Sequence, residues 1–331
     1  MSKIITKLIL GALFIVGGFF VIPDAQALTL IPPSFETSVD PGVTTDTTIK
    51  LYNETQDTLN LYPEVVSFTA DGETGNPTFD FNAPLEGVAS WFTLPEGPIT
   101  LTAGERKVVD VKITPPIDAE PGGHYATVFF GTTSPDLSDP GSLALSTKLG
   151  SLFLLRVFGD IKESGSINEF GLGGDKNTLS RLPATLFTRF QNEGNIHLRP
   201  TGTIKIVNML GGDTATLEFN SKKSATLPET IRRYETVWEK DQVKETSGNF
   251  WNKFWMEFSN EKNNFALGRY TATISLNAGN LVQDTATITF WIMPWRVISV
   301  ALVVFALVIV LLIILIKKYN QWIINKARKR K

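Results

Sequence analysis

The chain has 331 residues, with 31 Lys and Arg, 33 Asp and Glu, two histidines and no cysteine. The lack of cysteine excludes disulfides and thiolate metal sites, so apolar cores must hold the fold together. Residues 28–293 carry 21 basic and 32 acidic side chains, which is a net charge of −11. Because an acidic surface repels phosphate backbones, we predict no nucleic-acid partner.

The N-terminal segment has the pattern of a secretory signal peptide. It begins with lysines, continues as an apolar run up to Pro23, and then places small residues at Ala25 and Ala27. A charged start, an apolar centre and a small-x-small site are the features that a signal peptidase recognises. We therefore predict that residues 1–27 are a signal peptide, the alternative being an uncleaved membrane anchor.

The C-terminal segment predicts a single transmembrane helix over residues 297–316, which contain no charge and no proline. A helix of that length rises about 30 Å, enough to cross a hydrocarbon core. Trp291 and Trp295 precede the run, and the tail 317–331 has seven cations and no acid. Aromatic residues favour the membrane interface, and basic residues mark the side that is not translocated. We expect a plasma-membrane protein with its N-terminal ectodomain outside and its tail in the cytoplasm.

Between these ends the sequence predicts β-strands. Several segments alternate apolar and polar residues or are rich in β-branched and aromatic ones: TTIKLYN, TLNLYPEVVSF, ERKVVDVKIT and HYATVFFG. Turn clusters such as DGETGNP, LPEGP and DAEPGG separate them. Short strands with turns about every ten residues predict an all-β fold of the antiparallel sandwich type.

The same order of segments occurs twice. IKLYNE, which ends at Asn53-Glu54, is matched by LFTRFQNE, which ends at Asn192-Glu193, and each copy closes with a glycine-led tyrosine strand at Tyr125 or Tyr270. The spacing from asparagine to tyrosine is 72 residues in the first copy and 78 in the second. We therefore predict two tandem immunoglobulin-like β-sandwiches followed by one transmembrane α-helix.

The predicted boundaries follow from the composition. The first sandwich covers 28–133, the second 143–293, and a linker rich in Pro, Ser and Asp covers 134–142. Tyr125 and Tyr270 are candidates for structural tyrosine corners, in which the hydroxyl bonds back to the chain at the start of a strand.

No catalytic constellation is apparent in the sequence. His124 and His197 fall in different predicted domains, and no zinc, nucleophile-elbow, phosphate-loop or EF-hand motif occurs. We predict no cofactor, no metal site and no catalytic residues. The enzymatic alternative is a wall hydrolase whose paired carboxylates are brought together only by the fold.

One segment, residues 247–265, breaks the repeat because it is rich in aromatic residues. The candidate contact residues are Phe250, Trp251, Phe254, Trp255 and Phe258. Their spacing places them on one face of a helix, which Ser247 or Asn249 could cap. Three interpretations remain open: core filling, contact with the membrane interface, or a partner-binding face.

The first predicted domain resembles a known family. LTLIPPSFETSVDPGVTTDTTIKLYNETQDTLNLYPEVVSF and PPIDAEPGGHYATVFFG, within residues 28–131, are similar to the first domain of the WxL-interacting proteins of bacterial surfaces. The resemblance implies a wall-facing membrane protein whose first domain binds peptidoglycan and whose second domain meets a partner. The aromatic insertion at 247–265 departs from the family pattern, and no ligand residue is transferred.

The sequence therefore predicts a non-enzymatic, membrane-anchored envelope protein. It would bind or scaffold a cell-wall polymer or a partner surface protein through its immunoglobulin-like domains. The alternatives are a chaperone-like assembly factor that donates a strand to surface proteins, or a structural stalk in a membrane complex.

Overall fold

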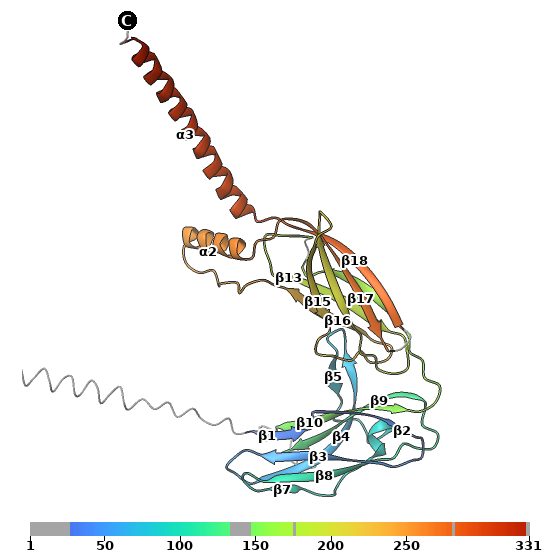
Figure 1. Cartoon of the computed structure of the whole chain (residues 1–331). Coiled ribbons are helices and arrows are strands. Elements are labelled where there is room, and N and C mark those ends of the chain that lie inside the picture. Colours follow the sequence, from blue (N-terminus) through green and yellow to red (C-terminus); the bar gives the residue numbers. More distant parts are fainter. Residues whose placement is uncertain (1–26, 133–146, 175–176, 280–281, 329–331) are drawn as a thin grey trace, which may run out of the picture.

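The computed structural model describes residues 27–132, 147–174, 177–279 and 282–328. Figure 1 shows two β-sandwiches in sequence, with a short helix α2 and a long helix α3 at the end of the second sandwich. The prediction of two tandem immunoglobulin-like sandwiches followed by one apolar helix is confirmed.

The first sandwich consists of two sheets. One sheet has the order β1 (Leu28–Ile31), β3 (Thr45–Asn53), β8 (Arg106–Ile113) and β6 (Phe92–Thr93). The other has the order β2 (Ser34–Val39), β10 (Lys148–Val157), β9 (Gly122–Gly131), β4 (Leu59–Asp71) and β5 (Asn76–Phe79). Strand β7 (Ile99–Leu101) pairs with the start of β4, and a 3-10 turn, η1 (Gly87–Trp91), leads into β6.

Alternation along the strands builds the core of the first sandwich. In β3, Ile49 and Leu51 point inward and meet Val111 of β8, while Phe130 and Phe153 close the core from the other sheet. All five side chains are at most 1% exposed. Burying such a side chain contributes roughly 1.5–3 kcal/mol each, so this layer accounts for much of the stability of a domain without disulfides.

The second sandwich repeats the topology of the first. Its smaller sheet has the order β11 (Gly165–Leu172), β13 (Ala184–Asn192) and β16 (Ile231–Trp238). Its larger sheet has the order β12 (Thr178–Leu179), β18 (Val282–Ile292), β17 (Gly268–Ala278), β14 (Thr201–Asn208) and β15 (Asp213–Phe219). Strand β12 runs parallel to β18, as β2 runs parallel to β10.

The repeated asparagines have the same role in the two sandwiches. Asn53 and Asn192 are fully buried, each at the end of its strand. The Asn53 amide donates to Leu101 O at 3.2 Å, and the Asn192 amide donates to Thr226 O at 3.0 Å. Each side chain thus joins its strand to a neighbouring segment, which explains the Asn-Glu repeat in the sequence.

The strand pairing corrects the predicted domain boundary. Strand β10 pairs with β9 over its whole length and with β2, and Phe153 and Leu155 lie in the first core. It therefore belongs to the first sandwich, whereas the prediction assigned it to a second domain over 143–293. The sheet needs this strand to cover β9, and the connection between the sandwiches follows it, at 158–164. The predicted linker 134–142 lies outside the described residues, and so does the signal peptide apart from Ala27.

Two helices complete the chain. Helix α2 (Phe250–Asn263) begins at Asn249, whose side chain accepts the Asn252 N–H at 3.0 Å, one of the two predicted caps. Helix α3 (Trp295–Arg328) contains the predicted run 297–316 and extends beyond it. By length and composition, its segment Trp295–Ile323 is long and apolar enough to cross a membrane.

Candidate functional site

The middle of β4 has a hydrogen-bonded neighbour on one side only. Residues 62–67 pair with β9, whereas β7 pairs with 59–61 and β5 with 68–71. No other backbone bond is found for 62–67 in the described part of the chain. Residues 62–67 of β4 therefore have one open edge, where alternate backbone N–H and C=O groups are free to pair.

Pro63 lies within this open stretch. Proline cannot donate to a ladder, so in sheets it is confined to edges, strand starts and bulges. Strand β4 has 13 residues, and Pro63 is its fifth. Its presence so far inside a strand is explained by the absence of a second partner strand at that point.

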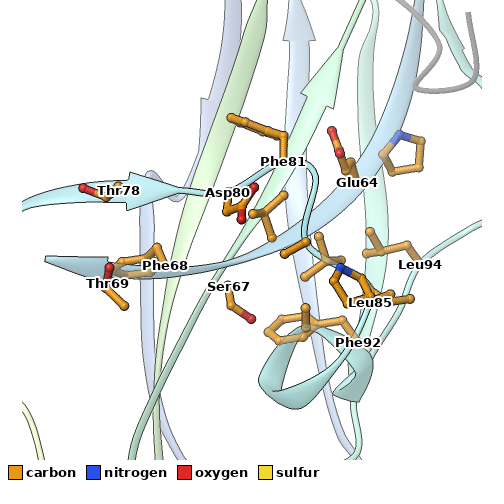
Figure 2. Close-up of a pocket in the computed structure, with 16 residues that line it drawn as sticks. Glu64, Ser67, Phe68, Thr69, Thr78, Asp80, Phe81, Leu85, Phe92 and Leu94 are labelled. Atoms are coloured by element: carbon orange, nitrogen blue, oxygen red, sulfur yellow. The ribbon is translucent and has the colours of Figure 1, made fainter. Parts of the chain in front are cut away.

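A groove lies beside the open edge, with a volume of about 560 Å³ (Figure 2). We call it the β4 groove. Its lining is mostly apolar and comes from β4, the end of β5, the following loop, η1 and β6: Pro63, Glu64, Val65, Val66, Ser67, Phe68, Thr69, Thr78, Asp80, Phe81, Ala83, Pro84, Leu85, Ala89, Phe92 and Leu94. Strand and groove together resemble the usual setting for an extended peptide, in which backbone bonds form along an edge and side chains enter adjacent pockets.

The loop over the groove is bonded to itself and leaves the edge of β4 open. The Asp80 carboxylate accepts the Asn82 N–H at 3.0 Å, and Asp80 O accepts the Ala83 N–H at 3.3 Å. Further along, Glu86 N–H donates to Pro84 O at 2.8 Å. Within the described residues, no hydrogen bond joins this loop to β4.

Two apolar side chains on the loop are held at the rim of the groove. Phe81 is 42% exposed and Leu85 is 64% exposed. The Phe81 ring packs on Phe129 with a centroid distance of 5.2 Å, and the Lys148 ammonium lies 4.1 Å from its centroid. Lys148 also pairs with Glu64 at 2.6 Å, so the one carboxylate on this part of β4 is neutralised.

A row of rings connects the groove with the junction between the sandwiches. Phe81, Phe129, Phe79, Phe68 and Tyr125 follow one another with centroid distances of 5.2, 4.9, 5.9 and 5.8 Å. These rings lie on the outer face of the larger sheet of the first sandwich. The row ends at the second sandwich, where Phe68 and Tyr125 pack near Ala225 and Leu227.

A polar cluster at this junction ties the two sandwiches together. The Tyr125 hydroxyl lies 3.3 Å from His197 Nδ1, and His197 Nε2 lies 2.7 Å from Glu36 Oε1. Arg199 Nη2 donates to Glu36 Oε2 at 2.7 Å. A neutral ring with its proton on Nε2 satisfies both contacts, because Nε2–H donates to Glu36 and Nδ1 accepts from Tyr125.

Burial and hydrogen bonding together set the ionisation of this cluster. Burial lowers the pKa of His197 below its ordinary value, and the bond to Glu36 offsets only part of that effect. For Glu36, burial raises the pKa, but bonds from His197 and Arg199 outweigh it, so its pKa lies below the ordinary value. Burial raises the pKa of Tyr125. The ring of His197 is therefore neutral over most of the physiological pH range.

The tyrosine-corner prediction is wrong for Tyr125, because its hydroxyl bonds across the junction to His197. Tyr270 has the local partner instead: its hydroxyl lies 3.3 Å from Leu267 N and 3.4 Å from Leu267 O, three residues upstream. The two tyrosines are equivalent in sequence but differ in role, because only the first strand faces the other sandwich.

The five aromatic residues of the insertion form one stripe on α2. Rings of Phe250 and Trp251, of Phe254 and Trp255, and of Trp255 and Phe258 meet edge to face at 5.4–5.6 Å. None belongs to the core of the second sandwich. Phe250, Trp251 and Trp255 are 73%, 65% and 52% exposed, so core filling is excluded for these three.

Sequence reasoning missed the β4 groove and the polar junction. Pro63, inside a long run of strand-forming residues, is a signal that could have pointed to an open edge. The loop residues Phe81 and Leu85 gave no periodic pattern, and the His197–Glu36 contact joins residues 161 positions apart. The described residues contain no group of three or more His, Asp or Glu side chains that could hold a metal ion.

Comparisons with known proteins give a fold likeness only. A scan of protein-family models finds no match, and neither does a comparison with curated proteins. Among solved structures, the class 5 fimbriae chaperone CfaA is similar over 81% of this chain and 100% of its own, at 13% identity and a TM-score of 0.38. The E. coli chaperone DraB matches over 80% and 97%, at 11% identity and a TM-score of 0.35.

A third structure, the Salmonella enterica SafA pilin with the SafB chaperone, matches over 80% of this chain and 97% of that one, at 9% identity and a TM-score of 0.32. Such identities and scores carry no argument about function.

Proposed function

We propose that this protein is a non-enzymatic, membrane-anchored envelope protein that binds an extended segment of a partner surface protein along the β4 groove. The observation that carries the proposal is the open edge of β4 at residues 62–67, next to an apolar groove of about 560 Å³. Stable sandwiches usually shield their strand edges with charges, bulges or covering loops, because an exposed edge invites pairing with other chains. An edge beside a groove is suited to receive a strand.

Strand addition explains the composition of the site. The backbone of the incoming segment bonds to β4, and alternate side chains enter between Val65, Phe68, Phe81 and Leu85. The only charge in the groove without a basic partner among the described contacts is that of Asp80, since Glu64 pairs with Lys148. The charge of Asp80 and the net charge of −11 over residues 28–293 are both negative. They favour a mostly apolar segment that carries a basic residue, and they disfavour an acidic segment.

Helix α3 supplies the anchor in this proposal. Its apolar stretch is flanked by Trp295 on one side and by Lys317, Lys318 and Tyr319 on the other. The excess of cations in the tail 317–331 supports a cytoplasmic position for that end, because basic residues tend to stay on the untranslocated side. The two sandwiches then lie outside the plasma membrane, after export directed by residues 1–27.

The groove residues support binding without bond chemistry. Neither histidine lines the groove, and its two carboxylates belong to Glu64, which pairs with Lys148, and to Asp80, which accepts the Asn82 N–H. The Asp80 contact orients the loop over the groove, and the Glu64–Lys148 pair joins β4 to β10. The function therefore rests on recognition, and affinity depends on how well the bound strand fits.

The test uses the full chain in detergent micelles and a displayed library of random dodecapeptides. Selected peptides are measured against Leu85→Asp, which places a charge at the groove rim, and against Ile117→Asp as the matched control. Ile117 is 86% exposed on a turn and does not line the groove. We expect Leu85→Asp to weaken binding at least tenfold, about 1.4 kcal/mol, and Ile117→Asp to leave it unchanged.

Equal binding by both variants would contradict the proposal. A second arm uses cell-wall sacculi from the organism as the probe. If the parent chain and Ile117→Asp sediment with sacculi and Leu85→Asp does not, the occupant of the groove is the cell-wall polymer. That result would overturn the proposal that a protein segment binds there.

A further inference from the structure

The exposed apolar side chains of the second sandwich are concentrated at one end. Every exposed Val, Ile, Leu, Met, Phe or Trp side chain that the structure describes between 161 and 293 lies toward the end where α3 begins. The strand register shows this: Gly268 of β17 pairs with Ile292 of β18, three residues before α3. The opposite end, near Ala278, faces the first sandwich and exposes none of these side chains among its described residues.

A turn and a helix form most of this apolar end. Met209 and Leu210, in the turn between β14 and β15, are 60% and 87% exposed. Met209 lies against Gly268, where an added Cβ would be 3.3 Å from its sulfur. Met209 stays more than half exposed despite its contact with Gly268, and Leu210 is almost fully exposed. Two large apolar side chains exposed at a hairpin tip indicate a surface that contacts something outside the protein.

Helix α2 contributes the largest apolar face. At 100° per residue, its five aromatic rings span about 140° of the helix circumference. Asn252, Ser259 and Asn263 lie on the opposite side, where Asn252 and Asn263 are exposed. Figure 1 shows α2 close to the start of α3 and at an oblique angle to it.

Buried ionic contacts fix α2 to the start of α3. The Glu261 carboxylate is fully buried and accepts the backbone N–H groups of Arg296 and Val297 at 2.9 and 3.2 Å. Arg296 Nη1 lies 2.7 Å from Glu261 Oε1 and 3.7 Å from Glu257 Oε2. The carboxylate thus caps α3 and opposes the positive end of its dipole. These contacts fix the position of α2 relative to the apolar stretch of α3.

We infer that α2 lies in the interface of the membrane that α3 crosses, with Phe250, Trp251 and Trp255 inserted between headgroups and acyl chains and the Met209–Leu210 turn beside them. The occupant of this surface is the lipid interface. The inference rests on the proposed anchoring by α3.

Three observations favour lipid over another protein. The face is continuous with a helix composed for a bilayer, and it is rich in tryptophan and phenylalanine, which prefer the interface. The other end of α3 carries a similar pair, Tyr319 and Trp322, stacked at 6.2 Å. Trp295 and Tyr319 are separated by 24 residues, about 36 Å of helix, so the two aromatic belts match the two faces of one bilayer.

The test exploits the absence of cysteine, since one introduced thiol is the only site for a nitroxide label. Four full-length variants, Trp251→Cys, Trp255→Cys, Asn263→Cys and Leu307→Cys, are reconstituted in vesicles of three parts phosphatidylcholine and one part phosphatidylglycerol. Collision rates with oxygen, which concentrates in lipid, and with a water-soluble nickel chelate report the depth of each label. Leu307, near the middle of 297–316, serves as the reference for insertion.

We expect several-fold higher oxygen-to-nickel ratios at 251 and 255 than at 263, and the highest ratio at 307. Equal, water-like ratios at 251, 255 and 263 with a lipid-like ratio at 307 would overturn the inference and leave the anchor intact. A water-like ratio at 307 would overturn the proposed anchoring as well. Shielding of 251 from both reagents would show a protein contact, such as a second copy, and would also overturn the inference.

Discussion

The buried carboxylate of Glu261 bonds to both the backbone and the guanidinium of Arg296, 35 residues later in the chain. This contact joins the aromatic insertion to the start of the apolar helix. Glu261 is fully buried, and the side chain of Arg296 is 21% exposed. Two charged groups remain in such a place because each satisfies the other and because the helix end supplies further donors.

Glu261→Ala is expected to release α2 from α3. The change leaves Arg296 without its nearest carboxylate and uncaps two backbone N–H groups, at a cost of about 1–3 kcal/mol. Hydrogen exchange of the α2 amides in the full chain should accelerate accordingly. The exposed Glu239→Ala serves as the control and should leave the rates unchanged. Unaltered protection of α2 in Glu261→Ala would show that other contacts hold the helix.

Acid is expected to loosen the junction between the sandwiches. The folded pKa of His197 lies below its ordinary value of 6.5, so the folded state binds its proton less well than the unfolded state. The neutral ring of His197 therefore contributes fully to stability above pH 6.5. This contribution is lost as the pH falls from 6.5 through the folded pKa. Glu36, with a pKa below its ordinary 4.5, adds a loss in the same direction at lower pH.

The groups that face His197 are Glu36, Arg199, Tyr125 and Arg156, and the two arginines oppose its protonation. Spin labels at Lys50→Cys and Glu218→Cys, one in each sandwich, should report a broader distance distribution at pH 5 than at pH 7.5. His197→Gln should remove the part of this change that sets in below pH 6.5, whereas His124→Gln should retain it. An identical pH response in the two variants would refute the assignment to His197.

Asn192→Ala is expected to destabilise the second sandwich by about 3 kcal/mol. The amide donates to Ile196 O and Thr226 O, and its oxygen accepts the Gly194 N–H at 2.9 Å. Alanine leaves these buried groups without partners. The measurement is denaturant unfolding of the full chain in micelles, followed by tryptophan fluorescence. The exposed Asn277→Ala should stay within about 0.5 kcal/mol of the parent chain, and an equal loss in both variants would contradict the account.

The fold could be predicted because its signals are local and repeated. Alternation in TTIKLYN places Ile49 and Leu51 inward, and the two Asn-Glu strand ends reveal the internal duplication. The apolar run 297–316 is a continuous signal. The boundary error arose because the strand β10 has no distinctive motif, and only its pairing with β9 and β2 shows to which sandwich it belongs.

The candidate sites depend on distant contacts and could be predicted only in part. The aromatic stripe on α2 follows from its spacing, but its exposure depends on Glu261 meeting Arg296. The open edge beside the β4 groove exists because β5 and β7 both end before they reach residues 62–67. Which strands pair with β4 depends on the fold and cannot be predicted from the residues of β4 alone. Pro63 is compatible with an open edge, but it carries no information about the loop and turn that lie beside that edge.

Amide hydrogen exchange at the open edge of β4 tests whether this strand receives an extended segment. A peptide selected from the random library is added to the full chain, and exchange is followed across 62–67. Pairing with a new strand would protect those backbone N–H groups of 62–67 that point away from β9. Pro63 has no N–H and contributes no signal.

We expect slower exchange within 62–67 when the peptide is bound, and no such change in Leu85→Asp. Unchanged exchange at 62–67 with a saturating peptide would show that the segment binds elsewhere and would contradict strand addition at β4.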